Sequence, residues 1–528
     1  MKTTLNFFLL FLFSQSLIGQ STLIPDSIFE KKLISLGYDI YPVDGSIPTA
    51  NIDTITNLDI SNDTIVNLTG IEGFTDLLTL DCSYNELTFL DLSQNLNLTE
   101  LECSYNPITS LNMTQNESLT FLECKGNSLD SIDVSQNLEL TYFDCSNCGL
   151  HTLDVSQNAL LRELYCIHSD FSNLTLSGAI SLEVLNCSHS SLTNLNLTQT
   201  PALIDLTCSG NDFTYLNVSQ NPLLETITNF NTPLNAINLD GAFALKRLVI
   251  QDNLISNLDL TQNPNLTHLN CRNNNLNGLD LSQNPLLEEI DFAFNNLTNL
   301  DLVNNVNLES VTGLSNQLTS FDVSQNPKLA FLNLYNNQLT NLTIAGADSL
   351  NYLTAIDNQL TSLDASQNSA LEFLQIWSNS LTCLNVKNGN NENLSLSAGV
   401  NPDLTCIQVD NVSLANEIWG PSWEINPMTI YEENCYSECI LDNTIYESEL
   451  ANLTIFPNPA IDHVQIKLGR LERNIQIQLL NSLGQIMLTE QFNSIEVINL
   501  ELNIPSGVYF LQYSGLNEQK STFKIIKE

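Results

Sequence analysis

Residues 98–113 read Leu98-Thr-Glu-Leu-Glu-Cys-Ser-Tyr-Asn-Pro-Ile-Thr-Ser-Leu-Asn-Met113, and this stretch decides the fold. Apolar side chains stand at its positions 1, 4, 6, 11, 14 and 16. Around Leu101 and Cys103 they alternate with polar ones, as in a β-strand with one buried face. The pattern recurs every 21 residues, so the stretch is one unit of a long repeat.

A column of cysteines at position 6 shows this period most clearly. Its seven consecutive members are Cys82, Cys103, Cys124, Cys145, Cys166, Cys187 and Cys208. Cys271 lies three periods later, and Phe292, Leu334 and Ile376 continue the column. A constant period of this length indicates a solenoid, in which each coil buries its apolar edge against its neighbours. We interpret the column thiols as core side chains that replace leucine.

Two columns of asparagine mark the turns of each coil. At position 9 the chain leaves the strand with unpaired backbone groups, which an amide can satisfy. This structural column comprises Asn85, Asn106, Asn127, Asn211, Asn253, Asn274, Asn295, Asn316, Asn337, Asn358 and Asn379. A second column, in a Ser-Gln-Asn signature, lies on the return side of each coil. We expect turns and short extended segments there.

The pattern resembles the leucine-rich repeat, LxxLxLxxNxL, over residues 58–386. The resemblance implies an α/β solenoid dominated by β-structure, a right-handed arc with a parallel sheet on its concave side. Solenoids need caps at both ends. Residues 21–57 are the expected N-terminal helical cap, in which Asp26 begins the helix and Gly37 ends it. Residues 387–440 are the expected C-terminal cap.

Charge and composition argue against several functions. The chain has 16 basic and 59 acidic residues, a net charge of −43, so nucleic acid and anionic membranes are poor partners. Part of the acidity is a column of aspartates such as Asp133, which we interpret as turn residues, with a row of calcium sites as the alternative. An open sheet does not exclude water as acid–base catalysis requires. We expect no enzyme activity, catalytic residues, cofactor or metal centre.

The first 20 residues predict a secretory signal peptide, with Lys2 followed by the apolar run 7–13. No other segment approaches the 18 apolar residues of a membrane-spanning helix. Thirteen cysteines in an exported chain raise the question of disulfides. Four of them lie outside the core columns and are candidates for one or two bridges: Cys383, Cys406, Cys435 and Cys439.

After an expected linker at 441–452, residues 453–528 contain six short β-rich runs, which predict a small β-sandwich. Its Pro-Asn-Pro start at 457–459, Asn-Ser-Leu-Gly at 481–484, Gly-Val-Tyr at 507–509 and closing Lys-Ile-Ile-Lys-Glu resemble the C-terminal sorting domain of the type IX secretion system. The resemblance implies a secreted or cell-surface protein that engages this machinery through residues 453–528. It leaves open whether the mature protein is anchored or released.

The concave strand face, at repeat positions 3, 5 and 7, is the candidate binding surface. It is acidic in the first half and aromatic in the last three strands. The candidate ligand-binding residues are Phe331, Tyr335, Tyr352, Ile356, Phe373 and Trp377. Exposed aromatic patches typically mark binding sites; the alternatives are that the C-terminal cap covers this patch or that the aromatic residues are incidental. We expect a monomer that recognises a protein or carbohydrate ligand in adhesion; the alternative is a structural surface-layer component without a specific ligand.

Overall fold

The computed structural model describes residues 20–419, 424–435, 454–456, 460–481, 485–502, 504–514 and 520–527. The chain divides into two units, Met1–Ser437 and Glu438–Glu528. Residues 1–19 of the expected signal peptide and the expected linker at 441–452 lie outside the described ranges. Within those ranges, no helix has the length and apolarity needed to cross a membrane.

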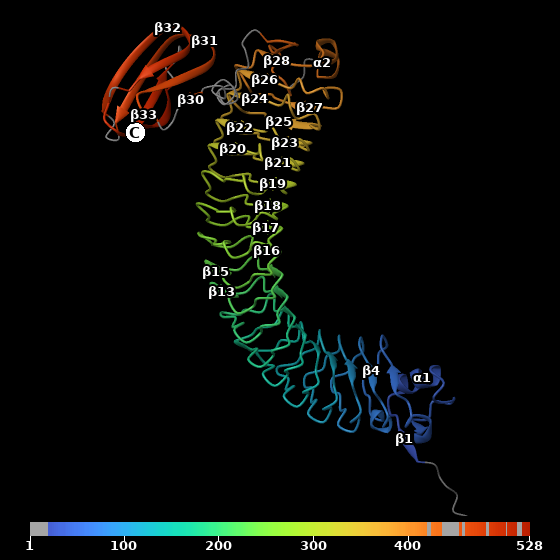
Figure 1. Cartoon of the computed structure of the whole chain (residues 1–528). Helices are drawn as coiled ribbons and strands as arrows, with labels where there is room; N and C mark the ends of the chain where they lie inside the picture. Colours follow the sequence, from blue (N-terminus) through green and yellow to red (C-terminus); the bar gives the residue numbers. More distant parts are fainter. Residues whose placement is uncertain are drawn as a thin grey trace, which may run out of the picture. The chain divides into compact units, whose positions relative to one another are not determined.

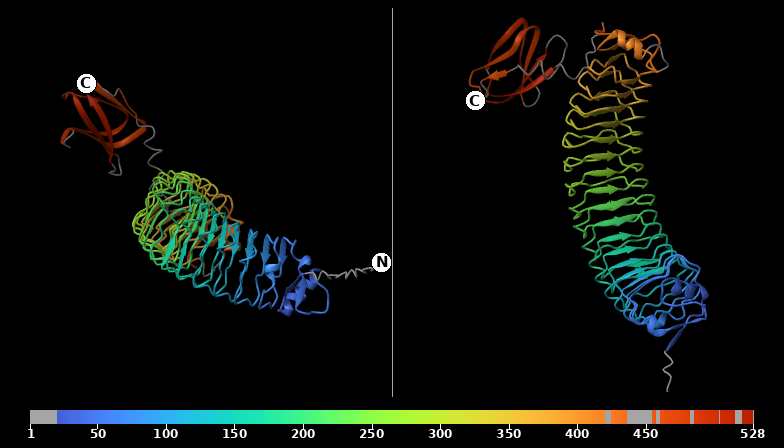
Figure 2. Two further views of the ribbon diagram at one scale, coloured as in Figure 1. Left: turned by 90° about the horizontal axis from the view of Figure 1, so that it is seen from below. Right: turned by 90° about the vertical axis from the view of Figure 1, so that its right-hand side faces the viewer.

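The first unit is a curved stack of coils with one long parallel sheet along its inner side (Figure 1; Figure 2, right). Seventeen three-residue strands pair in chain order from β3 (Asn57–Asp59) to β27 (Ser395–Ser397). Between them lie β4 (Thr79–Asp81), β5 (Glu100–Glu102), β6 (Phe121–Glu123), β7 (Tyr142–Asp144), β9 (Glu163–Tyr165), β11 (Val184–Asn186), β12 (Asp205–Thr207), β14 (Thr226–Thr228), β16 (Arg247–Val249), β17 (His268–Asn270), β18 (Glu289–Asp291), β19 (Ser310–Thr312), β21 (Phe331–Asn333), β23 (Tyr352–Thr354) and β25 (Phe373–Gln375). The predicted fold class is confirmed.

The outer side of the coils carries only short groups of strands. They are β8 (Thr152–Asp154) with β10 (Asn173–Thr175), β13 (Tyr215–Asn217) with β15 (Ala236–Asn238), β20 (Ser320–Asp322) with β22 (Asn341–Thr343), and the four strands β24 (Ser362–Asp364), β26 (Cys383–Asn385), β28 (Cys406–Gln408) and β29 (Ile430–Glu432). Figure 1 places β13, β15, β20 and β22 across the coils from β16–β19. The return side therefore consists of turns and short extended segments.

The interior combines thiols, leucines and amides. Every thiol of the position-6 column is fully buried. Beside it, the Asn127 amide donates to the carbonyls of Cys103 and Cys124 at 3.0 and 2.7 Å and accepts from Ile108 N at 3.2 Å. One side chain thus joins two successive coils, and the column repeats this along the solenoid.

The aspartate column lies in turns. Asp133 Oδ1 accepts a hydrogen bond from Ser135 N at 2.9 Å. Asp91 and Asp154 likewise accept from the backbone N–H of the serine two residues later. The backbone hydrogen bond is the main reason that the pKa of Asp133 is lowered. Each contact is an Asx turn, as the turn interpretation predicts.

The N-terminal cap contains β1 (Ser21–Leu23), α1 (Ser27–Ser35), β2 (Ser46–Pro48) and the 3₁₀ turn η1 (Thr49–Asn51), and a second 3₁₀ turn, η2 (Ile71–Gly73), lies in the first coil. Asp26 caps α1 by accepting from Ile28 N and Phe29 N. Its other oxygen accepts from Val66 N and Asn67 N at 2.9 and 3.0 Å. A single carboxylate therefore fastens the cap helix to the first coil.

At the other end, the main sheet extends beyond residue 386, where we expected the repeats to end, because β27 pairs with β25. Leu396 follows its register partner Leu374 by 22 residues instead of 21. The coil absorbs the one extra residue in its return turn, so its strand keeps the register. Helix α2 (Val412–Ile418) follows, and Trp419 Nε1 donates to Leu394 O at 2.9 Å, which closes the end of the core.

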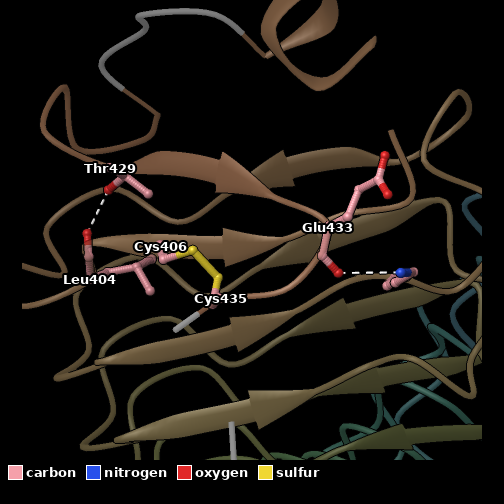
Figure 3. The surroundings of a disulfide bond; sticks show 6 residues. Leu404, Cys406, Thr429, Glu433 and Cys435 are labelled. Atoms are coloured by element: carbon pink, nitrogen blue, oxygen red, sulfur yellow. Dashed lines mark hydrogen bonds between the residues drawn. A yellow bond between two sulfur atoms is a disulfide. The ribbon is translucent and has the colours of Figure 1, made fainter. Parts of the chain in front are cut away.

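A disulfide between Cys406 and Cys435 fastens β29 to the last coils (Figure 3). Next to it, Thr429 Oγ1 donates to Leu404 O at 2.6 Å. Cys383 is also disulfide-bonded, whereas the fourth candidate, Cys439, lies outside the described residues. The Cys406–Cys435 bridge thus belongs to the C-terminal cap, and the nine free thiols lie in the core.

The second unit is antiparallel. Its five strands are β30 (Thr454–Phe456), β31 (His463–Asn481), β32 (Ile486–Glu501), β33 (Gly507–Ser514) and β34 (Lys520–Lys527). They enclose a separate apolar core that includes Val464, Ile477 and Leu511. Two of the six expected runs, 464–468 and 475–480, join in the single long strand β31.

Candidate binding surface

The candidate ligand-binding residues occupy three neighbouring strands near the C-terminal end of the main sheet. Phe331, Tyr352 and Phe373 are in direct register on β21, β23 and β25. Tyr335, Ile356 and Trp377 each follow their strand by two residues. We call these six side chains the C-terminal aromatic cluster.

Strand spacing sets the geometry of the cluster, because equivalent residues on adjacent parallel strands are about 4.8 Å apart. The rings of Phe331 and Tyr352 stack with centroids 4.7 Å apart and planes 14° apart. Phe373 is tilted by 38° at 6.0 Å from Tyr352. The rings of Phe331 and Tyr352, here called the inner rings, therefore turn their faces to each other and their edges to solvent. Phe373 ends the row on the C-terminal side.

The cluster is accessible. Tyr335 and Phe373 are 39% and 46% exposed, so the described part of the C-terminal cap does not cover them. Position 5 of these strands is polar and uncharged, because it carries Asn333, Thr354 and Gln375. The Tyr352 hydroxyl lies 3.4 Å from Gln375 Oε1. The surface offers apolar contact together with amide and hydroxyl hydrogen bonds.

A second row of aromatic rings lies on the same face nearer the N-terminus, and sequence reasoning missed it. Phe121 and Tyr142 stack at 4.4 Å with planes 7° apart, and Tyr165 lies 5.7 Å from Tyr142. We call these three the N-terminal aromatic cluster. The signal was present, because Phe121 and Tyr142 are 21 residues apart at position 3, but the acidic neighbours dominated the interpretation of these strands.

Carboxylates surround this second cluster at Asp81, Glu100, Glu102, Glu123, Asp144 and Glu163. Burial and then the charges of Asp81, Glu123 and Glu100 raise the pKa of Glu102. The pKa of the Tyr142 hydroxyl is raised mainly by burial and then by the negative charges of Asp144 and Glu123. A single cation enters the group, the Lys125 ammonium, 2.7 Å from Glu123 and 3.8 Å from Asp144.

Other sites of chemistry are not visible in the parts of the chain that the structure covers. Those parts contain no group of three or more His, Cys, Asp or Glu side chains placed to hold a metal ion. Two cavities of about 340 and 530 Å³ lie between coils, lined mainly by Ser, Thr and Asn at 172–199 and by residues 256–280. Neither contains an aromatic or basic side chain.

Comparison with known proteins agrees with this architecture. Residues 454–528 match the family model described as the secretion system C-terminal sorting domain. The solved structure of the leucine-rich repeat protein LIC12759 from Leptospira interrogans superposes with a TM-score of 0.55 at 24% identity, covering 63% of this chain and 92% of that one. The chain has the leucine-rich repeat fold, and its residues 454–528 match a secretion sorting domain. The sorting domain implies export by the type IX system to the cell surface or beyond it.

Two further relatives of this leucine-rich repeat protein share parts of it. YopM from Yersinia enterocolitica WA-314 superposes with a TM-score of 0.51 at 24% identity, covering 62% of this chain and 74% of that one. Internalin J of Listeria monocytogenes serotype 4b is 39% identical over 71 residues, 13% of this chain and 8% of the relative. The chain thus spans a small part of internalin J, and these likenesses establish the repeat fold.

Proposed function

We propose that this leucine-rich repeat protein is a recognition or adhesion protein at the cell surface or outside it, and that the C-terminal aromatic cluster binds its protein or glycan ligand. The observation that carries the proposal is the accessible row of Phe331, Tyr352 and Phe373 on an open sheet. Large apolar side chains left in water are costly, and binding surfaces typically use them.

Three features support a binding role for this face. The sheet is rigid at this place, because β21, β23 and β25 are each paired on both sides and backed by a continuous core, so little order is lost on binding. The polar side chains beside the rings can fix the orientation of a ligand. The sorting domain is consistent with export to the cell surface or beyond it, where extracellular protein and glycan ligands occur.

The test uses the mature full chain on glycan and extracellular-protein arrays. We expect specific ligands for the wild type, and the double variant Tyr352→Ser/Trp377→Ser should lose them by about tenfold or more, because hot-spot aromatic residues carry most of an interface's binding energy. The urea midpoint of unfolding should stay within experimental error, because both side chains are partly exposed. Silence of the wild type on both arrays would instead favour a structural surface-layer role.

A further inference from the structure

We propose that the N-terminal aromatic cluster and its carboxylates form a second, independent docking surface, which binds an arginine-bearing segment of a partner protein. The surface is centred on Glu100, Glu102 and Phe121, on the neighbouring strands β5 and β6. It is separate from the C-terminal aromatic cluster and does not depend on the function proposed for that cluster.

The first argument is charge. Six carboxylates face one ammonium across β4, β5, β6, β7 and β9. Glu100, Glu102 and Glu123 are partners or close neighbours on two adjacent strands, and like charges placed opposite each other destabilise a sheet. The ion pairs of Lys125 within this group are to Glu123 and Asp144. A cationic partner would reduce the remaining repulsion between the carboxylates.

The second argument is the open face of Phe121. One face of its ring is stacked on Tyr142. On the side of Phe121 away from Tyr142, the residue in register on the adjacent strand is Glu100, whose side chain is exposed. A planar cation can therefore enter between an aromatic face and a carboxylate. A guanidinium fits best, because it stacks on rings and binds carboxylates through two parallel hydrogen bonds.

The third argument is that the chain contains this arrangement elsewhere, filled by its own arginine. The guanidinium carbon of Arg272 lies 4.6 Å from the centroid of the Phe294 ring. Its Nη1 is 3.7 Å from an oxygen of Asp291, on the next coil. At Phe121 the ring and the carboxylates are present without a basic side chain of the chain between them in the described residues. The net charge of −43 would also attract a basic partner from a distance.

The experiment measures fluorescence anisotropy of a labelled peptide with three arginines spaced by Gly and Ser, mixed with the mature full chain at about 0.15 M salt. The matched probe has citrulline, an uncharged isostere, in place of arginine. We expect the arginine peptide to bind and the citrulline peptide not to bind. Glu100→Gln/Glu102→Gln should weaken binding about tenfold, and Phe121→Leu several-fold.

The control variant Glu288→Gln/Glu309→Gln removes the same charge from two exposed positions on adjacent coils elsewhere and should change affinity by less than about twofold. Equal losses in both pairs would overturn the proposal, since attraction would then be a property of the whole acidic chain. Stronger binding of a glucosamine oligomer, lost in Glu100→Gln/Glu102→Gln, would assign the surface to a cationic glycan instead. Tyr352→Ser/Trp377→Ser should leave arginine-peptide binding intact, which separates this site from the C-terminal cluster.

Discussion

Gly126 lies directly against the ring of Tyr105 on the preceding coil, and a Cβ atom at this glycine would lie 2.7 Å from Tyr105 Cδ1. Its φ of +68° is also in the left-handed region, which L-residues rarely adopt. The same repeat position holds Tyr84, whose ring stacks on Tyr105 at 4.6 Å. The glycine therefore ends a short row of stacked rings.

Gly126→Ala should lower the free energy of unfolding by about 2 kcal/mol, through the left-handed backbone and the clash with the ring. Gly278→Ala is the matched control, since no atom lies within 4 Å of its added Cβ and its φ is not positive. We expect that change to be neutral or slightly stabilising. The measurement compares the urea midpoints of unfolding of the two variants. Equal midpoints would contradict the close packing described at Gly126.

Asp26 joins the N-terminal cap to the first coil. Asp26→Ala removes the acceptor of four backbone donors, in α1 and at Val66 and Asn67, and should cost about 2–4 kcal/mol locally. Hydrogen exchange of residues 57–67 should accelerate. Asn411→Ala, which removes a cap bond to Leu414 N alone, should cost about 1 kcal/mol at the opposite end. Unchanged exchange of the first coil in Asp26→Ala would refute this role.

Nine free thiols lie in the core, and burial raises the pKa of Cys208 to about 12. At pH 8 a thiol reagent should label none of the eight position-6 thiols in the native protein and all of them in denaturant, because only the thiolate reacts. Rapid stoichiometric labelling of the native chain would contradict the solenoid core.

The same burial makes stability depend on pH. The folded protein holds the protons of the eight position-6 thiols more tightly than the unfolded chain, whose thiols titrate near 9.0. The thiols' contribution is therefore fully present below pH 9 and falls as the pH rises from 9 towards 12, by up to about 1.4 kcal/mol per unit for each thiol. Cys208→Ala should reduce the slope of unfolding free energy against pH in this range. An unchanged slope would show that Cys208 does not contribute.

The period of the sequence predicted the strands, the buried thiols and the two asparagine columns, because a 21-residue repeat places every member of a column in the same environment. Features that depend on contacts between unlike positions could not be predicted in this way. The space that Gly126 leaves for Tyr105 and the pairing of Cys406 with Cys435 are of this kind. The extra coil at Ser395–Ser397 was missed because Asn-rich residues 388–393 break the period while leaving the strand register intact.

The candidate binding surface could also be predicted only in part from the sequence. The sequence placed Phe331, Tyr352 and Phe373 on adjacent strands, yet it did not show that the inner rings turn their edges to solvent. That orientation follows from a strand spacing close to the preferred stacking distance of two rings. Phe373, at the C-terminal end of the row, is the most exposed of the three rings.

The most direct test compares two pairs of exposed aromatic residues in the mature full chain. Tyr352→Ser/Phe373→Ser changes the concave face, and Phe89→Ser/Phe243→Ser changes side chains that are 66% and 53% exposed outside the main sheet. With the best ligand from the arrays, the concave pair should lose affinity by about tenfold or more and the other pair should stay within about twofold. Loss of binding in the Phe89/Phe243 pair, with the concave pair unaffected, would show that the ligand binds elsewhere.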